Sequence, residues 1–377
     1  MIIINKKFDG IAYSYDDYTI EKQVYFDIET TGFVADKSFL YLIGCCYYQD
    51  NTWNLIQWFC ESPTDEFDVL QQFIQFLEPF EVCIHYNGTT FDIPYITRKC
   101  KKFNLDFSFQ NIKSIDLYKC AQTLKSLLHL DSCTQKAVEQ ALSISRDDQF
   151  TGGELIQVYA NYLGLAKLEK LQREKNNSGE LLHLLLLHNE DDLIGLQAIT
   201  SILSYQKLIH GCYDVSNLNL DTQNRICFEL NLHQALPVPF LFQEANISIE
   251  GKNNDCVIKV PLFEGTLKYY VDDYTNYYYL PLEDSIVHKS IAGAMDKDYH
   301  LRATKDNCYI KKTALFLPQF QSDWTPVFRL ERKDKNAYLE CTDERLQDSE
   351  FIQEYTNHIL TTLLSSKVRK ARKVSSS

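Results

Sequence analysis

Two acidic residues close an apolar strand near the N-terminus. The stretch 24-VYFDIETTGF-33 begins with Val-Tyr-Phe and then places Asp27 and Glu29 one residue apart. Residues i and i+2 of a strand point to the same side, so these two carboxylates are predicted neighbours. Like charges this close are unfavourable without a cation, and Mg²⁺ and Mn²⁺ prefer oxygen ligands of this kind. The pair indicates a metal site, and the alternative is a strand end in water.

A third acid, Asp92, lies in 85-HYNGTTFDIPYI-96, between a predicted strand and a predicted helix. Asp is a favoured helix-capping residue, which is one interpretation of this position. The residues around it favour another interpretation, because Asn87 lies in the preceding turn and Phe91 directly precedes the acid. Under that interpretation Asp92 joins the first two acids at one site.

The segment 188-HNEDDLIGL-196 supplies a further acid on a long predicted helix. His188 and Asp192 are four residues apart and share a helix face, whereas Asp191 lies about 100° round the helix from Asp192. A polar patch on an exposed face is the simple interpretation. Leucines on both sides of the segment instead predict a mostly buried helix, in which a His and an Asp are costly unless they are paired or bind metal.

Strands and helices alternate around these acids in a way that predicts a mixed α/β sheet. Helical spacing is evident at 65–80 and 91–103, and helices dominate 118–205, ending in a long helix at 179–206. The expected strands of this part are Val24–Ile28, Phe39–Tyr48, Trp53–Cys60, 82–88 and Ser114–Leu117.

The C-terminal part is predicted to be a separate, smaller α+β domain. The polar segment 213–224 is the best boundary, which gives domains at 1–212 and 213–377. A closing helix is expected at about 343–364, followed by a basic tail at 367–373. The segment 269–312 interleaves tyrosines with bases, which is compatible with a packed core or with a nucleic-acid platform. Strands are expected at Arg225–Leu232, Val257–Val260, Thr266–Val271, Cys308–Lys311 and Tyr338–Cys341.

Composition excludes several classes of protein. The net charge of −13 argues against a protein that merely coats nucleic acid. No apolar run reaches the roughly 18 residues of a membrane span, and the N-terminal pattern is the reverse of a signal peptide. The twelve cysteines show no zinc-site spacing. We therefore expect a cytoplasmic protein with reduced cysteines, no membrane association and no small-molecule cofactor.

The ordered set of acids resembles the DEDD (DnaQ-like) superfamily of ribonuclease H-like 3′→5′ exonucleases. DIET is similar to the first exonuclease motif, YNGTTFDIPYI to the second, as in the proofreading domains of family B DNA polymerases, and HNEDD stands where the third is expected. The segments 116-DLYKCAQTL-124 and 146-RDDQFTGGELIQVYANYL-163, with Lys136 and Glu139, more specifically resemble the YprB-like family. The resemblance covers about residues 22–205 and implies a ribonuclease H-like mixed sheet with flanking helices.

This resemblance implies a role for each acid. Asp27, Glu29, Asp92 and Asp192 would bind two divalent ions, Mg²⁺ or Mn²⁺, and His188 would take part in catalysis. The family has a Tyr four residues before the last Asp or a His five before it. Here a His has the Tyr spacing, which leaves open whether His188 is the general base and whether Asp191 replaces Asp192. Asp116 is expected to be structural.

Further residues are expected to contact a single strand of DNA or RNA. Basic side chains would track the backbone, although the run 98-RKCKK-102 is equally compatible with a solvated helix face. The predicted contacts are Thr30, Asn87, Phe91, Arg98, Lys136 and Arg146.

The function predicted from these patterns is hydrolysis of phosphodiester bonds in single-stranded nucleic acid by a two-metal mechanism, with a 3′→5′ exonuclease as the expected form. The alternative is a ribonuclease H-like module that binds nucleic acid without cutting it. A complete acidic set favours the enzyme, and the His in place of Tyr favours the alternative.

Overall fold

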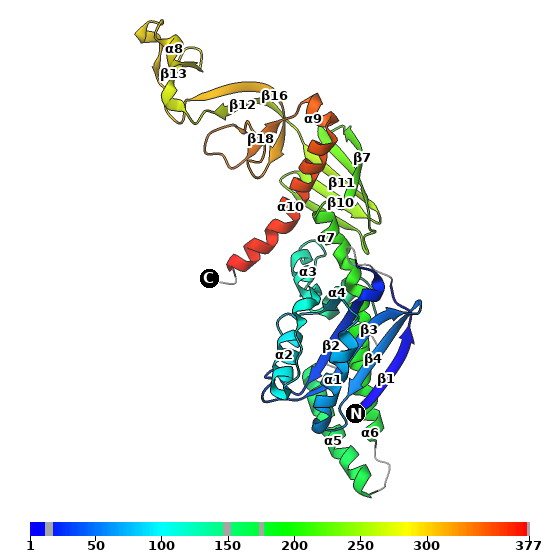
Figure 1. Ribbon diagram of the computed structural model, residues 1–377. Helices are drawn as coiled ribbons and strands as arrows, with labels where there is room; N and C mark the ends of the chain where they lie inside the picture. The colour runs from blue at the N-terminus through cyan, green and yellow to red at the C-terminus, as the bar shows by residue number, and fades with distance from the viewer. Residues whose placement is uncertain (12–17, 146–151, 173–176, 375–377) are drawn as a thin grey trace. The chain divides into compact units, whose positions relative to one another are not determined.

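The computed structural model describes residues 1–11, 18–145, 152–172 and 177–374 (Figure 1). The chain folds into two compact units, Met1–Leu203 and Ser204–Ser377. The domain boundary between residues 212 and 213 stays a prediction. No helix in these ranges has both the length and the apolar character that crossing a membrane requires.

The first unit is built on a six-stranded sheet with the order β1-β4-β3-β2-β5-β6. The pairs β1–β4, β4–β3 and β3–β2 are antiparallel, whereas β2–β5 and β5–β6 are parallel. The predicted mixed α/β sheet is thus confirmed. The strands are β1 (Ile2–Phe8), β2 (Gln23–Thr30), β3 (Leu40–Gln49), β4 (Thr52–Phe59), β5 (Val82–His85) and β6 (Lys113–Asp116).

The strand β1 was not expected from the sequence. It contains Lys6 and Lys7, both exposed, which obscure the alternation of a strand with one buried face. Its place at the edge of the sheet accounts for them, because charged side chains are tolerated on edge strands and discourage pairing with other chains.

Helices cover both faces of this sheet (Figure 1). The long helix predicted at 179–206 is in fact interrupted, because α6 ends at Ile199 and a 3₁₀ turn at Thr200–Ile202 separates it from α7. The helices of this unit are α1 (Glu66–Leu77), α2 (Asp92–Phe103), α3 (Leu117–Leu124), α4 (Gln135–Ala141), α5 (Gly152–Gln172) and α6 (Ser178–Ile199), and α7 (Leu203–Ile209) begins at its last residue and belongs to the second unit.

The period of two along each strand divides the central strands between α1 and α6. The side chains that face α1 are aromatic and pack on its Phe73 and Phe76: Phe26, Tyr47 and Trp58. On the opposite face, three paired positions beneath α6 carry polar side chains or none: Asp27, Gly44 and Gln57. The core extends over both faces, since Leu185 and Leu186 of α6 belong to the same cluster as Phe26 and Trp58. The polar positions are those considered below.

The run 98-RKCKK-102 on α2 is only partly a solvated face. Lys101 and Lys102 are exposed, but Lys99 is completely buried. Its Nζ lies 2.5 Å from Glu66 Oε1 and donates a hydrogen bond to the Ser38 carbonyl at 2.6 Å. The expectation that Lys99 contacts the nucleic-acid backbone or faces solvent is therefore wrong, because its ammonium group is buried and paired with Glu66.

Replacement of Lys99 by Met is expected to lower the free energy of unfolding by about 3 kcal/mol, because it leaves the buried Glu66 carboxylate without its counter-charge. Urea denaturation measures this change. Lys101→Met, on the exposed side of the same helix, is the matched control and is expected to change the value by less than about 0.5 kcal/mol. Equal effects of the two replacements would contradict the structural role of Lys99.

The second unit is β-rich. It contains a five-stranded sheet in the order β7-β8-β11-β10-β9, a closed barrel β12-β16-β18-β17 and a small sheet β14-β13-β15. All five strands expected here overlap observed ones. The strands are β7 (Tyr213–Leu220), β8 (Arg225–Leu232), β9 (Phe240–Glu244), β10 (Ile247–Lys252), β11 (Asp255–Pro261), β12 (Phe263–Tyr270), β13 (Tyr277–Leu280), β14 (Ser285–His288), β15 (Leu301–Arg302), β16 (Tyr309–Gln319), β17 (Phe328–Arg329) and β18 (Ala337–Glu340).

Two segments of this unit differ from the prediction. The polar segment 213–224 is not a linker, because β7 occupies most of it as an edge strand with only Tyr213 fully buried. The single closing helix is divided at Asp348, which is extended, and continues through the basic run at 367–373. The helices are α8 (Lys289–Ala292), α9 (Asp343–Gln347) and α10 (Ser349–Val374).

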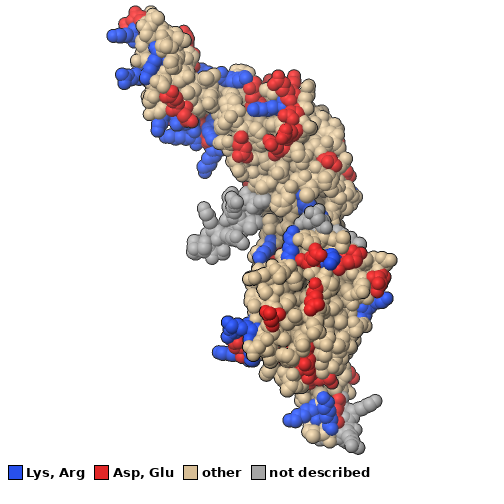
Figure 2. Space-filling view, in the orientation of Figure 1, with Lys and Arg blue, Asp and Glu red and all other residues tan. Residues whose placement is uncertain are grey.

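The tyrosine-rich segment 269–312 is largely packed on itself. Tyr277 contacts the ring of His288 and Tyr278 contacts that of His300. Basic and acidic side chains are interspersed on the surface of β13 and α8 (Figure 2). The packing and the mixed charge favour the core interpretation of this segment.

All twelve cysteines lie within the described ranges as free thiols, most of them buried. This arrangement agrees with the expectation of reduced cysteines, and burial raises the thiol pKa of residues such as Cys45 and Cys46.

Candidate active site

The C-terminal half of β2 presents Asp27 and Glu29 on the face that α6 covers. Asp27 is half-buried and Glu29 is buried, with 8% of its surface exposed. The register between β2 and β3 shifts after Glu29, which leaves Tyr41 as an extra residue in β3. Its hydroxyl donates to Glu29 Oε2 at 3.4 Å, so the irregularity directs a buried phenol to this carboxylate.

Asp92 is the first residue of α2, and its carboxylate reaches the same end of β2. Burial raises the pKa of Asp92 to about 7, and its own backbone N–H and that of Ile28 oppose this rise. The N-cap of α2 is Phe91, and among the described residues no side chain caps this end of the helix. The capping interpretation of Asp92 is therefore wrong, because Asp92 lies one residue inside the helix.

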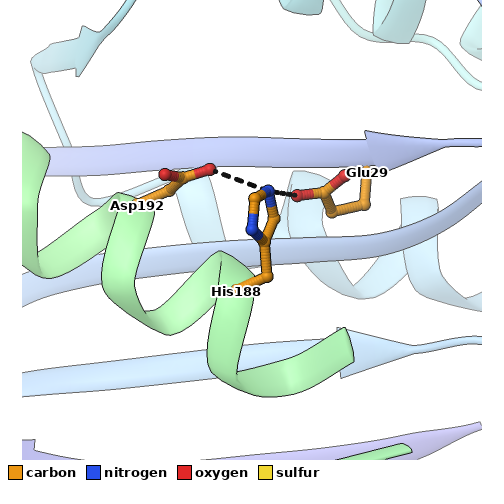
Figure 3. Close-up of side chains that lie close together, drawn as sticks. All are labelled: Glu29, His188 and Asp192. Carbon is orange, nitrogen blue, oxygen red and sulfur yellow. Dashed lines mark ion pairs between the residues drawn. The ribbon is translucent and has the colours of Figure 1, made fainter. Parts of the chain in front are cut away.

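The helix α6 places His188 between two carboxylates (Figure 3). Its Nε2 lies 3.5 Å from Glu29 Oε1 and 3.3 Å from Asp192 Oδ2. One ligand atom of each residue lies within 4.8 Å of those of the other two. Ligands bonded at roughly 2.1 Å to one divalent ion are separated by roughly 3.0–3.4 Å, so the spacing suits a single cation.

The carboxylates of Glu29, Asp92 and Asp192 all affect the pKa of Asp27. Burial raises the pKa of the Asp27 carboxyl well above its usual range. Three other carboxylates raise it further, those of Glu29, Asp192 and Asp92, and a hydrogen bond from Asn189 partly opposes them. Acids from β2, α2 and α6 thus influence one another in one region, and such a group of like charges favours the binding of a cation.

The geometry favours Asp192 over Asp191 as the acid of α6 that belongs to this group. Asp192 contacts His188 and repels Asp27, as the i and i+4 spacing predicts. Within the described residues, the group whose ligand atoms lie close enough to hold one metal ion is Glu29, His188 and Asp192; Asp191 is outside it, and so are Asp27 and Asp92.

Asp116 stabilises the turn between β5 and α2, which contains Asn87. Its carboxylate accepts the backbone N–H groups of Asn87 at 2.8 Å, Thr89 at 3.3 Å and Tyr118 at 3.1 Å. Nearby His85 accepts from the Gly88 N–H at 3.1 Å, and burial lowers the pKa of this imidazole to about 4. These groups fix the turn that leads into α2, which agrees with the structural role expected for Asp116.

The expected nucleic-acid contacts lie in different surroundings. The Thr30 hydroxyl donates to the Gly32 carbonyl, and Asn87 has a left-handed φ of 59° with its side chain hydrogen-bonded to Thr90. Both side chains therefore shape turns beside the acids. Phe91 is half-buried, and its ring lies edge-on to that of Phe33, which is 89% exposed, with 6.0 Å between the centroids.

The basic residues differ from one another. Lys and Arg side chains gather on the surface over α2 (Figure 2). Arg98 is exposed there, but its guanidinium forms an ion pair with Asp36 at 2.8 Å. Lys136 is exposed on α4, and Arg146 lies outside the described residues.

Three buried polar residues of this region were missed from the sequence: Gln57, Asn189 and Tyr41. Asn189 stands inside the segment HNEDD, and an amide next to His188 on a leucine-rich helix was the available signal. Its Nδ2 donates to Asp27 Oδ2 at 2.9 Å. Gln57 and Tyr41 gave no signal, because their positions depend on strand register.

A family model of the RNase H superfamily matches residues 24–204. The match runs from β2 to the start of α7 and contains all four acids. Together with the mixed sheet and its helices, it gives this unit an RNase H-like fold. No curated protein matches the chain.

Solved structures that resemble the RNase H-like chain include a family B DNA polymerase from the hyperthermophilic archaeon Pyrobaculum calidifontis. The identity is 12%, the TM-score is 0.34, and the similarity covers 69% of this chain but only 36% of the polymerase. Another is the zinc-bound form of the Escherichia coli ExoI–ssDNA complex, with 12% identity, a TM-score of 0.27 and coverage of 90% and 73% of the two chains.

Proposed function

We propose that this protein is a divalent-metal-dependent nuclease that hydrolyses single-stranded nucleic acid, in the manner of the DEDD 3′→5′ exonucleases and their YprB-like members. The observation that carries the proposal is the group of Glu29, His188 and Asp192, whose ligand atoms lie within 4.8 Å of one another, and Asp27 and Asp92 add negative charge beside it. Four carboxylates that repel one another are costly to keep in a scaffold that only needs to bind.

The donor set fits divalent cations. Four carboxylates supply hard oxygen ligands for Mg²⁺ or Mn²⁺, and the spacing of the acids around His188 suits one ion. Two bound ions would polarise the scissile phosphate and lower the pKa of the attacking water. Asp27, which the other three acids repel, would hold the ions together with Glu29, Asp92 and Asp192.

The protein's own groups then orient the substrate and move the proton. His188 lies beside the acids, where a neutral imidazole nitrogen could accept the proton of the attacking water. Phe33 and Phe91 offer aromatic rings on which a terminal base could stack. Thr30 and Asn87 shape the turns on either side, and Lys136, which is exposed on α4, would contact the backbone of the strand.

A second function is favoured by one observation. The Nε2 of His188 lies 3.5 Å from Glu29 and 3.3 Å from Asp192, so its imidazole contacts both carboxylates without any metal. A module that binds nucleic acid without cutting it is therefore the alternative to the nuclease.

End-labelled single-stranded DNA and RNA distinguish the two functions. We expect Mn²⁺ to produce a ladder of shortened products and EDTA to stop it, because the metal supplies the charge that the reaction requires. With a 5′ label, stepwise shortening indicates 3′→5′ polarity, and a 3′ label released as a mononucleotide confirms it. A gel shift with intact strands in Mn²⁺ would contradict the nuclease and support the binding module.

A further inference from the structure

Three residues on neighbouring strands form a row beneath α6. Asp27 pairs in register with Gly44, and Gly44 pairs with Gln57, so the row crosses β2, β3 and β4. The middle position has no side chain. A Cβ atom added at Gly44 would lie 2.0 Å from Asn189 Oδ1, so the space left by the glycine is filled by the amide of Asn189.

The amide of Asn189 joins the two ends of this row. Its Nδ2 donates to Asp27 Oδ2 at 2.9 Å, and its Oδ1 accepts from Gln57 Nε2 at 2.9 Å. Both amides are completely buried. Water is therefore a poor substitute for either bond, and losing one leaves a buried polar group unsatisfied.

The direction of these bonds is fixed by the backbone of α6. Gln57 Nε2 also donates to the carbonyl oxygen of Leu186 at 2.9 Å. A carbonyl can only accept, so Gln57 must present its NH₂ group here. Asn189 must then turn its oxygen to Gln57 and its NH₂ group to Asp27. A flipped Asn189 would bring two donors together on one side and two acceptors on the other.

We propose that Asn189, oriented by Gln57, is a positioning residue that holds the carboxylate of Asp27 in the geometry needed for metal binding. This inference rests on the proposed function. Three other carboxylates repel that of Asp27, and a completely buried amide that donates to its Oδ2 holds it against this repulsion. Buried hydrogen-bond partners of metal ligands act in this way, and their loss typically costs about 10–100-fold in metal affinity or activity.

The test is the Mn²⁺ dissociation constant, measured by isothermal titration calorimetry without nucleic acid, in a double-mutant cycle. Asn189→Leu is expected to raise it about 10–100-fold and to lower kcat by a similar factor, with little change in KM for the strand. Gln57→Met is expected to have a smaller effect. Gln57→Met should not change the Mn²⁺ dissociation constant further in the Asn189→Leu background, because Gln57 affects metal binding through the amide of Asn189.

Gln23→Met is the matched control, because it removes another buried amide from the same strand as Asp27. It is expected to leave the dissociation constant within about twofold of wild type. Gly44→Ala is a second route to the same effect. It changes no polar group but displaces the Asn189 amide, and it should weaken Mn²⁺ binding by about 10-fold. It also replaces Asn189→Leu in the test if that variant fails to fold.

An unchanged dissociation constant in Asn189→Leu, or in Gly44→Ala, would overturn the positioning role. A further loss on adding Gln57→Met to Asn189→Leu would overturn the part assigned to Gln57. A different result would contradict the proposed function itself. In that case the Mn²⁺ dissociation constant of Asp27→Asn would equal that of wild type. If Asp27→Asn loses Mn²⁺ while Asn189→Leu retains it, only the positioning role fails.

Discussion

Replacement of Asp27 by Asn is expected to reduce hydrolysis by on the order of 10³-fold or more, about 4 kcal/mol of transition-state stabilisation. The pKa of Asp27 is raised by burial and by Glu29, Asp192 and Asp92, so its carboxylate is the one expected to gain most from a bound cation. Asn keeps the size of the side chain but cannot supply an anionic oxygen to two ions. Single-turnover hydrolysis of an end-labelled strand in Mn²⁺ measures the effect.

The same replacement is expected to leave the fold intact. In the absence of metal it removes one of four like charges, so the free energy of unfolding in EDTA should be equal to or greater than that of wild type. Thermal unfolding with and without Mn²⁺ provides the check, because the metal should raise Tm in wild type but much less in the variant. Full activity of Asp27→Asn would remove this site from the mechanism.

Two adjacent acids of α6 are expected to respond very differently to the same change. Asp192→Asn should lower activity by about 10²–10³-fold, because Asp192 contacts His188 and adds to the charge around Asp27. Asp191→Asn is the matched control, since it removes an equal charge one residue away. We expect it to alter activity by less than about threefold.

The comparison is made with kcat and the Mn²⁺ concentration at half-maximal activity. The Asp192→Asn variant should require more Mn²⁺ as well as turn over more slowly. The reverse ranking of the two variants would exchange the roles of Asp191 and Asp192. Equal and small effects would show that α6 supplies no ligand to the site.

The sequence was informative about this site where function and local structure coincide. Asp27 and Glu29 stand at the end of a strand whose alternation is visible in the sequence, and Asp92 stands at a recognisable turn between strand and helix. The order of these motifs along the chain then indicated a known arrangement. The mixed sheet followed from the same alternation of strands and helices.

The features that could not be predicted depend on contacts between distant segments. The bridge from Gln57 through Asn189 requires the register of three strands and the absence of a side chain at Gly44. Lys99 looks like part of a solvated basic face until Glu66, on another helix, is placed beside it. Neither the cross-strand register nor the partner helix leaves a local pattern in the sequence.

The strand β7 was not expected within the segment 213–224 for a related reason. Only Tyr213 of this strand is fully buried, and most of its other residues are exposed at the edge of the sheet, four of them polar: Asp214, Ser216, Asn217 and Asn219. Edge strands have one neighbour, so their composition approaches that of a loop. The alternation that reveals central strands such as β3 is absent there.

The most direct test of the central claim is a crystal structure of the protein soaked in Mn²⁺, with the ions located by their anomalous scattering. We expect two peaks about 3.5–4 Å apart, bound by Asp27, Glu29, Asp92 and Asp192, with Asp27 in contact with both. Absence of anomalous density among these four carboxylates at saturating Mn²⁺, or an Asp192 side chain turned away from the other three, would contradict the account.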